Sequence, residues 1–454
     1  MINAIDNAQQ FIEDLARFRA DHPDTRYVDG FIVDVNGHVR GKRVPIDQAA
    51  KLGAGIPLCA AVLFLDYQGL THDAGGMGIS DGDPDILIRA VPGTLAPVPW
   101  SPVPIAQVLM EYRLPDGGPY PLDPRHVMAR TVARLQADGL TPVVAYEAEF
   151  FLLDPAPRND GGLQPPIDPL TGRRIAEGQV YSLDQVEAFE ALLHDIATAC
   201  DIQKIGAGPA ISEYGVGQFE VNLTHRTDAL RAADECVLFQ RVVRRIALRH
   251  GFRATFAAKP YPDDVGSGLH LHISLKDALG TPLFANTPAV LEHAIAGMLA
   301  TFGEAMALYA PNRNSYRRLA PDCFVPVNRS WGWDNRSTAL RVPLDAGENR
   351  RIEHRMAGAD ANPYLVGAAA LAGLHHGVIQ RLHPPPPAQG DACKVADPDL
   401  PLRWGTALDA MEAATVLPDY LGTDFWRMYR LMKQAELAAD EDASPPHGLP
   451  SVTL

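Results

Sequence analysis

Four strand-like segments, far apart in the chain, carry charged side chains on one face and apolar side chains on the other. The last of them spans residues 349–355. Because side chains alternate along a β-strand, Arg351, Glu353 and Arg355 share one face, while Ile352 points to the opposite face. A carboxylate between two guanidiniums suits a metal ligand set among groups that bind phosphate or carboxylate oxygens. The chain is therefore expected to build a sheet with one charged, ligand-binding face.

A second segment, predicted as a strand over residues 143–152, places Glu147 and Glu149 on one face. Two carboxylates about 7 Å apart along a strand can hold one cation each or bracket two cations. Two solvated glutamates on an exposed face are the alternative, because charged side chains are usually exposed. The apolar neighbours Phe150 and Phe151 favour burial, and buried carboxylates must be neutralised.

A third segment, a predicted strand over residues 269–275, places His270, His272 and Ser274 on one face. An isolated His-x-His pair more often packs or faces solvent than binds metal, so both interpretations stay open here. The preceding Gly266-Ser267-Gly268 allows a ligand to approach the backbone closely. A neutral imidazole would bind a metal, and the second histidine would donate to phosphate.

The fourth segment, residues 213–220, supplies Glu213 and Glu220 around a glycine-rich stretch. A glycine-rich turn that opens a strand is the alternative interpretation. Arginines also cluster in the last third of the chain, which is typical of a solvated face or of an anion-binding patch. These arginines are Arg313, Arg317, Arg318, Arg329, Arg336, Arg341, Arg350, Arg351 and Arg355.

The chain as a whole is acidic, with a formal net charge of −15. Local positive charge in an acidic protein indicates a small anionic ligand such as a nucleotide phosphate. Five carboxylates with histidine favour Mg²⁺ or Mn²⁺ over zinc. Carboxylate-held ions beside arginines match phosphoryl transfer. The residues alone therefore predict a metal-dependent enzyme that uses ATP.

The composition limits the other possibilities. A chain of 454 residues exceeds one compact core, so two domains are expected. The acidic balance argues against binding to nucleic acid or to anionic membrane. No apolar run approaches the roughly 20 residues that span a bilayer, and no secretory signal is visible. The five cysteines are odd in number, lack Cys-x-x-Cys spacing and predict reduced thiols in the cytoplasm.

The pattern along the chain predicts an α+β fold, with strands and helices mixed without regular βαβ spacing. Residues 1–20 are expected to form an amphipathic helix, and residues 25–48 a hairpin that turns at Asn36-Gly37. Prolines between residues 97 and 104 lie near the expected domain boundary. Later helices are predicted over residues 124–138, 184–199, 228–250, 288–309 and 361–382.

The four segments stand in the order found in glutamine synthetases, together with Asn314-Ser315-Tyr316-Arg317-Arg318-Leu319, Asn335-Arg336-Ser337 and Ala361-Asn362-Pro363-Tyr364-Leu365. The chain resembles this family from about residue 25 to residue 440. The resemblance implies a small N-terminal β-grasp domain over residues 1–115 and a large catalytic domain with an antiparallel sheet over residues 116–454. It also implies a homo-oligomer, a dodecamer of two hexameric rings, with active sites between neighbouring subunits.

The resemblance assigns roles residue by residue, with two or three Mg²⁺ or Mn²⁺ ions in each site. Glu149, Glu213 and Glu220 resemble the ligands of one metal, and Glu147, His270 and Glu353 those of another. His272, Ser274, Arg341 and Arg351 match ATP contacts, while Gly266, Arg318 and Arg355 match groups around the glutamate substrate. Arg336 matches an arginine that stabilises the transferred phosphoryl group. The implied reaction forms γ-glutamyl phosphate, from which an amine displaces phosphate.

Departures from the ammonia-using members bear on the amine. Those members carry a glutamate where this chain has Phe324, and a neutral aromatic suits a carbon chain better than ammonium. Their N-terminal motif is replaced by residues 65–69, in which Asp66 matches the amine-facing carboxylate. Trp331 is expected beside Phe324 in an amine pocket, with core packing as the alternative.

These departures resemble the glutamate–amine ligases, including γ-glutamylpolyamine synthetases, and favour putrescine-like amines. Two alternatives remain at this point: a true glutamine synthetase that uses ammonia, and a catalytically silent relative with a structural or sensing role. The sequence leaves open which amine is the substrate, the ring size and the mode of regulation.

Overall fold

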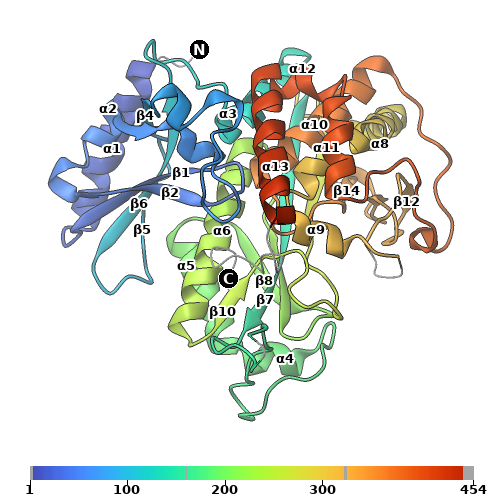
Figure 1. Cartoon of the computed structure of the whole chain (residues 1–454), viewed down its shortest axis with the longest axis horizontal. Helices are drawn as coiled ribbons and strands as arrows, with labels where there is room; N and C mark the ends of the chain where they lie inside the picture. Colours follow the sequence, from blue (N-terminus) through green and yellow to red (C-terminus); the bar gives the residue numbers. More distant parts are fainter. Residues whose placement is uncertain (1–3, 160, 322–324, 443–454) are drawn as a thin grey trace.

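Two β-sheets organise the chain, and the helices gather mainly around the larger one (Figure 1). The computed structural model describes residues 4–159, 161–321 and 325–442. The strands of the smaller sheet are β1 Tyr27–Val33, β2 Val39–Pro45, β3 Ile56–Cys59, β4 Asp85–Ala90, β5 Ala96–Pro97 and β6 Ile105–Arg113. The strands of the larger sheet are β7 Thr141–Leu153, β8 Ala207–Ser212, β9 Gln218–Leu223, β10 Arg253–Thr255, β11 Leu269–Lys276, β12 Trp331–Trp333, β13 Leu340–Val342 and β14 Ile352–His354.

The helices follow the predicted order. They are α1 Ala4–Asp21, α2 Lys51–Ala54, α3 Pro124–Ala137, α4 Leu183–Ala188, α5 Glu190–Ile202, α6 Ala229–Arg249, α7 Leu283–Asn286, α8 Pro288–Tyr309, α9 Arg313–Arg318, α10 Pro363–Gln380, α11 Trp404–Glu412, α12 Leu417–Leu421 and α13 Thr423–Asp442. In the described part of the chain, no helix is both long enough and apolar enough to cross a membrane.

The smaller sheet has the order β2-β1-β6-β4-β3, with β5 paired to β6. Strands β1 and β6 run parallel, and the other pairs are antiparallel. The predicted hairpin of β1 and β2 is confirmed, but its predicted two-residue turn is wrong. Of the two turn residues only Gly37 has positive φ, at 80°, and Asp34 N donates to His38 O over 2.9 Å. The loop is therefore a three-residue one, which needs only a single left-handed residue.

The larger sheet has the order β12-β13-β14-β11-β7-β9-β8, with β10 paired to β7. Its pairs are antiparallel except for β12 with β13, so the expected antiparallel sheet is confirmed with one parallel edge pair. This small N-terminal sheet followed by a large sheet-and-helix unit is the expected fold. The domain boundary between residues 115 and 116 stays a prediction.

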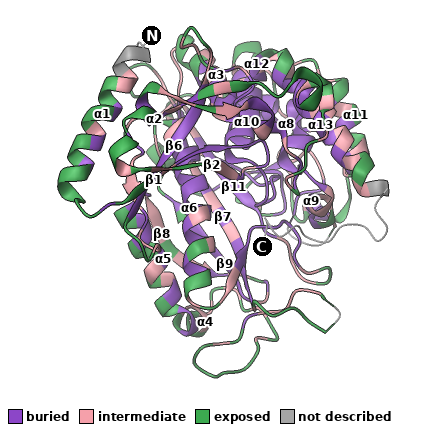
Figure 2. Ribbon diagram, turned by 60° about the vertical axis from the view of Figure 1, so that its left-hand side comes forward, coloured by how far each residue is buried: buried purple, intermediate pink, exposed green. Residues whose placement is uncertain are grey.

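Helix α6 packs against β7, and α10 lies against α3, α6 and α8. Figure 2 shows α8 and α10 coloured mostly as buried. A side chain at Gly297 of α8 would overlap the backbone of Gly373 and Gly377 of α10, so glycine is what lets these two helices approach closely. The predicted helix over residues 184–199 is divided into α4 and α5 at Phe189, whose buried ring packs on Phe219 and Phe252.

The tip of the N-terminal hairpin is fastened to the last helix by a buried lysine. Lys433 of α13 has no exposed surface, and its Nζ donates to Asn36 Oδ1 over 2.6 Å and to Glu436 Oε2 over 2.9 Å. Asn362, which caps α10, donates to Asp34 O in the same hairpin over 2.7 Å. The N-terminal hairpin, α10 and α13 therefore share one buried polar network.

We expect Lys433→Met to destabilise the protein by about 3 kcal/mol or more, because it leaves the Glu436 carboxylate buried without its cation. The loss would be measured as a lower midpoint of thermal or denaturant-induced unfolding at fixed protein concentration. The double variant Lys433→Met/Glu436→Gln removes both charges and should recover part of the loss. Equal midpoints for the wild type and Lys433→Met would contradict this account of the network.

Candidate active site

The register of the larger sheet brings the predicted ligand residues side by side. Strand β7 pairs with β11 so that Glu147 lies opposite His270, and with β9 so that Glu149 lies opposite Glu220. Strand β11 pairs in turn with β14, which sets His272 opposite Glu353. Directly opposed residues of an antiparallel pair point to the same face. Four strands, β7, β9, β11 and β14, therefore deliver their charged side chains to one face, and Glu213 lies just before β9.

The opposite face of β7 is apolar, and it fixes which way the carboxylates point. Tyr146, Ala148 and Phe150 have no exposed surface. The Phe150 ring lies 6.4 Å from the Phe239 ring of α6 and 5.6 Å from the Phe256 ring. A one-residue slip in register would expose these side chains and bury the glutamates against α6. The aromatic core thus holds the charged face in place.

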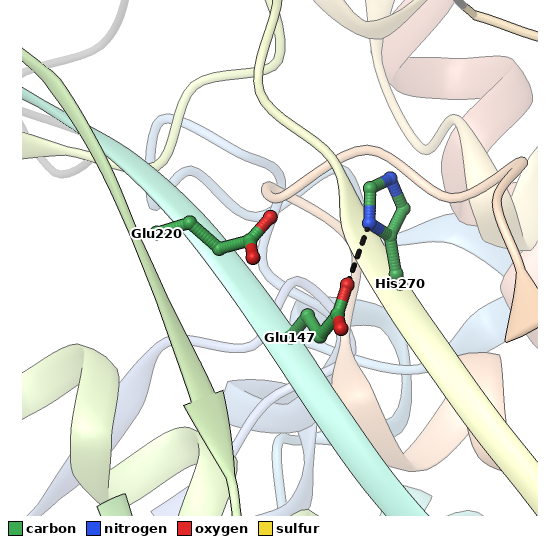
Figure 3. Close-up of side chains that lie close together, drawn as sticks. All are labelled: Glu147, Glu220 and His270. Atoms are coloured by element: carbon green, nitrogen blue, oxygen red, sulfur yellow. Dashed lines mark hydrogen bonds and ion pairs between the residues drawn. The ribbon is translucent and has the colours of Figure 1, made fainter. Parts of the chain in front are cut away.

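Glu147 lies at the centre of the charged face (Figure 3). Its Oε2 lies 3.1 Å from His270 Nδ1, and its Oε1 lies 2.7 Å from His272 Nε2. Donor atoms of Glu147, Glu220 and His270 all lie within 4.8 Å of one another, and so do donor atoms of Glu147, His272 and Glu353. Each group supplies three donor atoms that converge, as metal coordination requires.

This grouping differs from the ligand sets implied by the resemblance. Glu147 belongs to both groups, and His272, expected as an ATP contact, converges with Glu353. His272 Nε2 lies close enough to Glu147 Oε1 to form an ion pair. Burial would raise the pKa of Glu147, but His272 and His270 hold it well below its usual value. A buried imidazole nitrogen and a carboxylate oxygen this close can also serve as two ligands of one cation.

Glu149 is held by groups from two other segments. Gln218 Nε2 donates to its Oε2 over 3.1 Å, and Gly268 N donates to the same oxygen over 2.8 Å. A side chain at position 268 would lie 2.8 Å from His270 Nε2 and 2.9 Å from Arg318 Nη2, so any residue larger than glycine would displace these two groups. These bonds orient the carboxylate, as the outer hydrogen bonds of a metal ligand do.

The carboxylates near β9 are crowded together. Burial and the neighbouring Glu149 carboxylate raise the pKa of Glu213 to about 7, although the charge of Arg336 opposes the shift. Burial also raises the pKa of Glu220 to about 9, with the charges of Glu147 and Glu149 adding to the effect. Both groups therefore favour the protonated form unless a cation neutralises the cluster. A divalent ion fits this donor set, since it would balance the repulsion among the carboxylates.

Glu353 has the opposite environment. It is almost fully buried, yet Arg355 donates to its Oε1 and Arg341 Nη1 donates to its Oε2 over 2.7 Å. Burial alone would raise the pKa of Glu353, but Arg355, His270 and His272 together lower it to about 2. The predicted arrangement of Glu353 between arginines is present, although the second arginine is Arg341 of the neighbouring strand rather than Arg351. Arg351 Nε instead donates to His272 Nδ1 over 3.1 Å.

Two cavities open on this face. The first, here called the central cavity, has a volume of about 160 Å³. Its charged part consists of Glu149, Glu213, Glu220, His270, Arg318, Arg336 and Arg355. Its remaining wall consists of Val180, Tyr181, Tyr214, Gln218, Val265, Gly266 and Val325. The cavity therefore joins the predicted metal ligands to the predicted glutamate-binding and phosphoryl-binding arginines.

Arg318 is buried at the base of the central cavity. Its Nη1 donates to Met356 O over 2.9 Å and its Nη2 to Arg355 O over 3.3 Å, whereas its Nε has no hydrogen-bond partner among the described residues. Burial lowers the pKa of Arg318 to about 10, although the Glu149 carboxylate opposes this shift. A buried guanidinium with a free donor is a ready site for a substrate carboxylate.

The second cavity, here called the flanking cavity, has a volume of about 680 Å³. Its lining includes Glu147, Asn222, Arg226, His272, Ser274 and Arg351. Three of the four predicted ATP contacts, His272, Ser274 and Arg351, thus line one cavity together with Glu147, whose strand neighbour Glu149 lines the central cavity. The fourth, Arg341, lies between Glu353 and Asp334, with Nε donating to Asp334 Oδ1 over 3.0 Å.

Two predicted residues, Asp66 and Trp331, do not line these cavities within one chain. Asp66 lines a separate cavity of about 650 Å³, where His72 Nε2 lies 2.6 Å from its Oδ2. Trp331 is buried, and its Nε1 donates to Pro385 O over 2.6 Å, which is the core-packing alternative. Phe324 lies outside the described residues. The roles of these residues stay predictions.

Sequence reasoning missed the roles of several residues at the site. Gln218 orients Glu149 through a bond that depends on tertiary packing, which the sequence alone does not indicate. Tyr181 and Tyr214 line the central cavity from irregular segments that carry no periodic signal. The positive φ of Tyr181, 58°, is uncommon for a side-chain-bearing residue, and no sequence pattern indicates it.

Comparison with known proteins supports the geometry. A family model described as "Glutamine synthetase, catalytic domain" matches residues 121–447. Gamma-glutamylputrescine synthetase of Escherichia coli is 39% identical over 94% of this chain and 91% of its own length. Glutamate–isopropylamine ligase of a Pseudomonas species is 35% identical over 85% of this chain and 84% of its own length. A glutamine synthetase of Pyrococcus horikoshii is 32% identical over 87% of this chain and 86% of its own length.

Solved structures agree with these matches. A structure described as GmaS without ligand superposes with a TM-score of 0.81 at 27% identity, covering 95% of this chain and 97% of that one. A complex of GmaS with ADP gives a TM-score of 0.80 at 26% identity, covering 95% and 97% of the two chains.

We predict that the metal-free protein loses stability as the pH rises from about 5 to 9. The folded-state pKa values of Glu213 and Glu220, about 7 and about 9, exceed the ordinary value of 4.5. Their contribution to stability is therefore complete below pH 4.5 and is lost as the pH rises through these values. Glu147 and Glu353 have lowered pKa values, so their contribution is already complete above pH 4.5 and stays constant across this range.

The measurement is the midpoint of thermal unfolding in chelator across this pH range. Glu220→Gln should flatten the fall, and saturating Mn²⁺ should reverse it, because the cation stabilises the ionised cluster. Glu187→Gln, at an exposed position of α4, serves as the control and should keep the wild-type slope. A midpoint that rises with pH in chelator would contradict the assignment of a crowded carboxylate cluster.

Proposed function

The chain belongs to the glutamine synthetase family, and from this premise we propose that it is an ATP-dependent ligase that joins the γ-carboxylate of glutamate to an amine. The family's catalytic domain implies the use of ATP and a divalent metal. Relatives named for γ-glutamylputrescine, isopropylamine and γ-glutamylethanolamide ligation support an amine rather than ammonia as the acceptor. Among amines, putrescine-like diamines are favoured.

The observation that carries the choice of an amine is the mixed wall of the central cavity. Val180, Val265 and Val325 add apolar surface, and Tyr181 and Tyr214 add aromatic surface, opposite the charged residues. Both tyrosines are largely exposed in the single chain, with 61% and 54% of their surface accessible, so their rings border the entrance rather than the core. Ammonia has no carbon to bury, whereas the methylenes of an alkylamine gain from such a wall.

The glutamate substrate is assigned to the arginine side of the central cavity. The free Nε of Arg318 supports a role in binding the substrate α-carboxylate, and Arg355 and Gly266 line the same cavity. Arg355 Nε donates to Arg336 O over 3.1 Å, which ties the glutamate-binding arginine to the segment that carries Arg336. This arrangement would direct the γ-carboxylate toward the carboxylate cluster, where phosphoryl transfer requires it.

ATP is assigned to the flanking cavity, with its base away from the cluster and its γ-phosphate toward Glu147. His272, Ser274 and Arg351 would contact the nucleotide, and Arg341 would act beside Glu353. A γ-carboxylate oxygen attacks the γ-phosphorus as ADP departs, giving γ-glutamyl phosphate. The amine nitrogen then attacks the acyl carbon, phosphate leaves, and the nitrogen loses a proton. Arg336 would neutralise charge on the moving phosphoryl group.

Glu147, Glu149, Glu213, Glu220, His270 and Glu353, joined by His272, would hold two or three Mg²⁺ or Mn²⁺ ions. When bound, these ions would supply electrostatic neutralisation of the phosphate oxygens. The oxygen-rich donor set supports Mg²⁺ or Mn²⁺ over zinc.

A homo-oligomer, a dodecamer of two hexameric rings in the cytoplasm, completes the proposal. In that assembly Asp66 of one subunit would face the amine site of its neighbour. The separation of Asp66 from the central cavity within one chain supports this division of the site. Phe324 and Trp331 remain proposed parts of the amine pocket.

We expect putrescine to exceed ammonia in kcat/KM by about a hundredfold, because burying four methylenes contributes at most about 3 kcal/mol. The assay is phosphate release with glutamate, ATP and Mg²⁺ across putrescine, isopropylamine, ethanolamine, methylamine and ammonia. Val265→Asn, which makes the wall polar, should reduce the preference. Release that is fastest with ammonia would indicate a true glutamine synthetase, and no release with any acceptor would indicate a catalytically silent relative.

We expect Arg336→Ala to lower kcat by about a thousandfold, because a guanidinium that meets the transferred phosphoryl acts mainly in the transition state. The KM for ATP should change little. Arg329→Ala is the control, since Arg329 pairs with Asp397 and Asp399 away from the central cavity. A similar kcat for both variants, measured with saturating substrates, would remove Arg336 from the mechanism.

A further inference from the structure

Arg318 lies at the end of a helix that is too short to be stable on its own. Helix α9 has six residues and ends at Arg318. An isolated helix of this length is unstable in water, so its position must come from tertiary contacts. The proposed glutamate site therefore depends on whatever fixes α9.

A buried carboxylate outside the cavities provides that contact. Asp360, in the segment between β14 and α10, accepts a hydrogen bond from Asn312 Nδ2 over 2.9 Å and another from Ser315 Oγ over 2.8 Å. All three side chains are buried. Asn312 Oδ1 in turn accepts from Asn314 N over 2.9 Å and caps the start of α9. Asp360 thus holds both the cap and the first turn of the helix.

The far end of α9 is tied to the same segment. Arg318 donates to the carbonyl oxygens of Arg355 and Met356, which lie a few residues before Asp360. The helix is therefore attached to one stretch of chain at both ends. That stretch also carries Arg355, the other predicted glutamate-binding arginine, so a shift at Asp360 would change the spacing of the two guanidiniums.

The same helix also supports the cavity wall. Asn314 Oδ1 accepts from Lys259 N over 2.9 Å, and Asn314 Nδ2 donates to Lys259 O over 2.8 Å. The segment that begins at Lys259 continues to Val265 and Gly266, which line the central cavity. Movement of α9 would therefore displace Arg318 and this wall together.

We propose that Asp360 is a positioning residue for glutamate binding, acting through α9 on Arg318. It lies outside the residues that line the central and flanking cavities. The role rests on the proposed function, because it assumes that Arg318 binds the glutamate carboxylate. Loss of Asp360 should therefore weaken binding at the glutamate subsite and leave binding at the nucleotide subsite, beside Glu147, unchanged.

The test compares steady-state kinetics of Asp360→Ala and Asp360→Asn. Asp360→Ala should raise the KM for glutamate about tenfold, because it removes the acceptor of two buried hydrogen bonds, and should change the KM for ATP less than about twofold. Asp360→Asn keeps an acceptor oxygen and should stay within about threefold of the wild type. Should Asp360→Ala not fold, Ser315→Ala removes one of the two bonds and should raise the glutamate KM by a smaller factor.

Asp123→Ala is the matched control. Asp123 is also a buried carboxylate that caps a helix, since it accepts from Arg125 N over 2.9 Å at the start of α3. Its loss should lower the unfolding midpoint without a selective rise in the KM for glutamate. A double-mutant cycle of Asp360→Ala with Arg318→Lys should be non-additive for glutamate binding, since one residue acts through the other.

The outcomes are distinguishable. Suppose that the wild type is active and that Asp360→Ala leaves the KM values for glutamate and ATP unchanged or alters both equally. That result would overturn the positioning role and leave the proposed function intact. The absence of glutamate-dependent phosphate release by the wild type would overturn the proposed function and this inference with it.

Discussion

Repulsion among carboxylates on one face of the larger sheet is the constraint on which the site depends. Strand register forces Glu147, Glu149 and Glu220 together, and Glu213 joins them from the adjoining turn. The aromatic core on the reverse of β7 prevents the strand from slipping to relieve the crowding. The folded sheet therefore holds carboxylates that repel one another, and a bound cation would relieve this repulsion. Folding and ligand binding are linked through this one surface.

The charged face is also divided electrostatically. Around Glu353, Arg341 and Arg355 neutralise the carboxylate and lower its pKa, whereas around Glu220 the neighbours are acidic and raise the pKa. The protein's own arginines thus balance the negative charge at Glu353, whereas an external cation would have to balance the charge at Glu220. Arg355, which balances Glu353, also lines the central cavity with Glu220, so the two environments border one site.

The alternation of side chains made the charged strand faces predictable, and the pairing of Glu147, His270 and Glu353 follows once the strands are set side by side. The register itself was not predictable, because it depends on the packing of Phe150 and Phe256. The hairpin of β1 and β2 was predicted, but its turn type was not, since Asn36 is engaged with Leu65 O and Lys433. The position of Trp331 was beyond sequence reasoning for a similar reason, because it is set by a contact with the distant Pro385, and no pattern indicated that Asp66 would pair with His72.

The bond between Lys433 and the hairpin at Asn36 joins residues 397 positions apart. During synthesis the hairpin emerges early, and Asn36 can bond to Leu65 O soon afterwards, but its bond to Lys433 must wait for α13. The strands of the smaller sheet all lie between Tyr27 and Arg113, so they can pair before α13 is made. A polypeptide without α13 would keep this sheet but would leave Asn36 Oδ1 without the lysine that binds it, so docking of α13 is a late step in completing the fold.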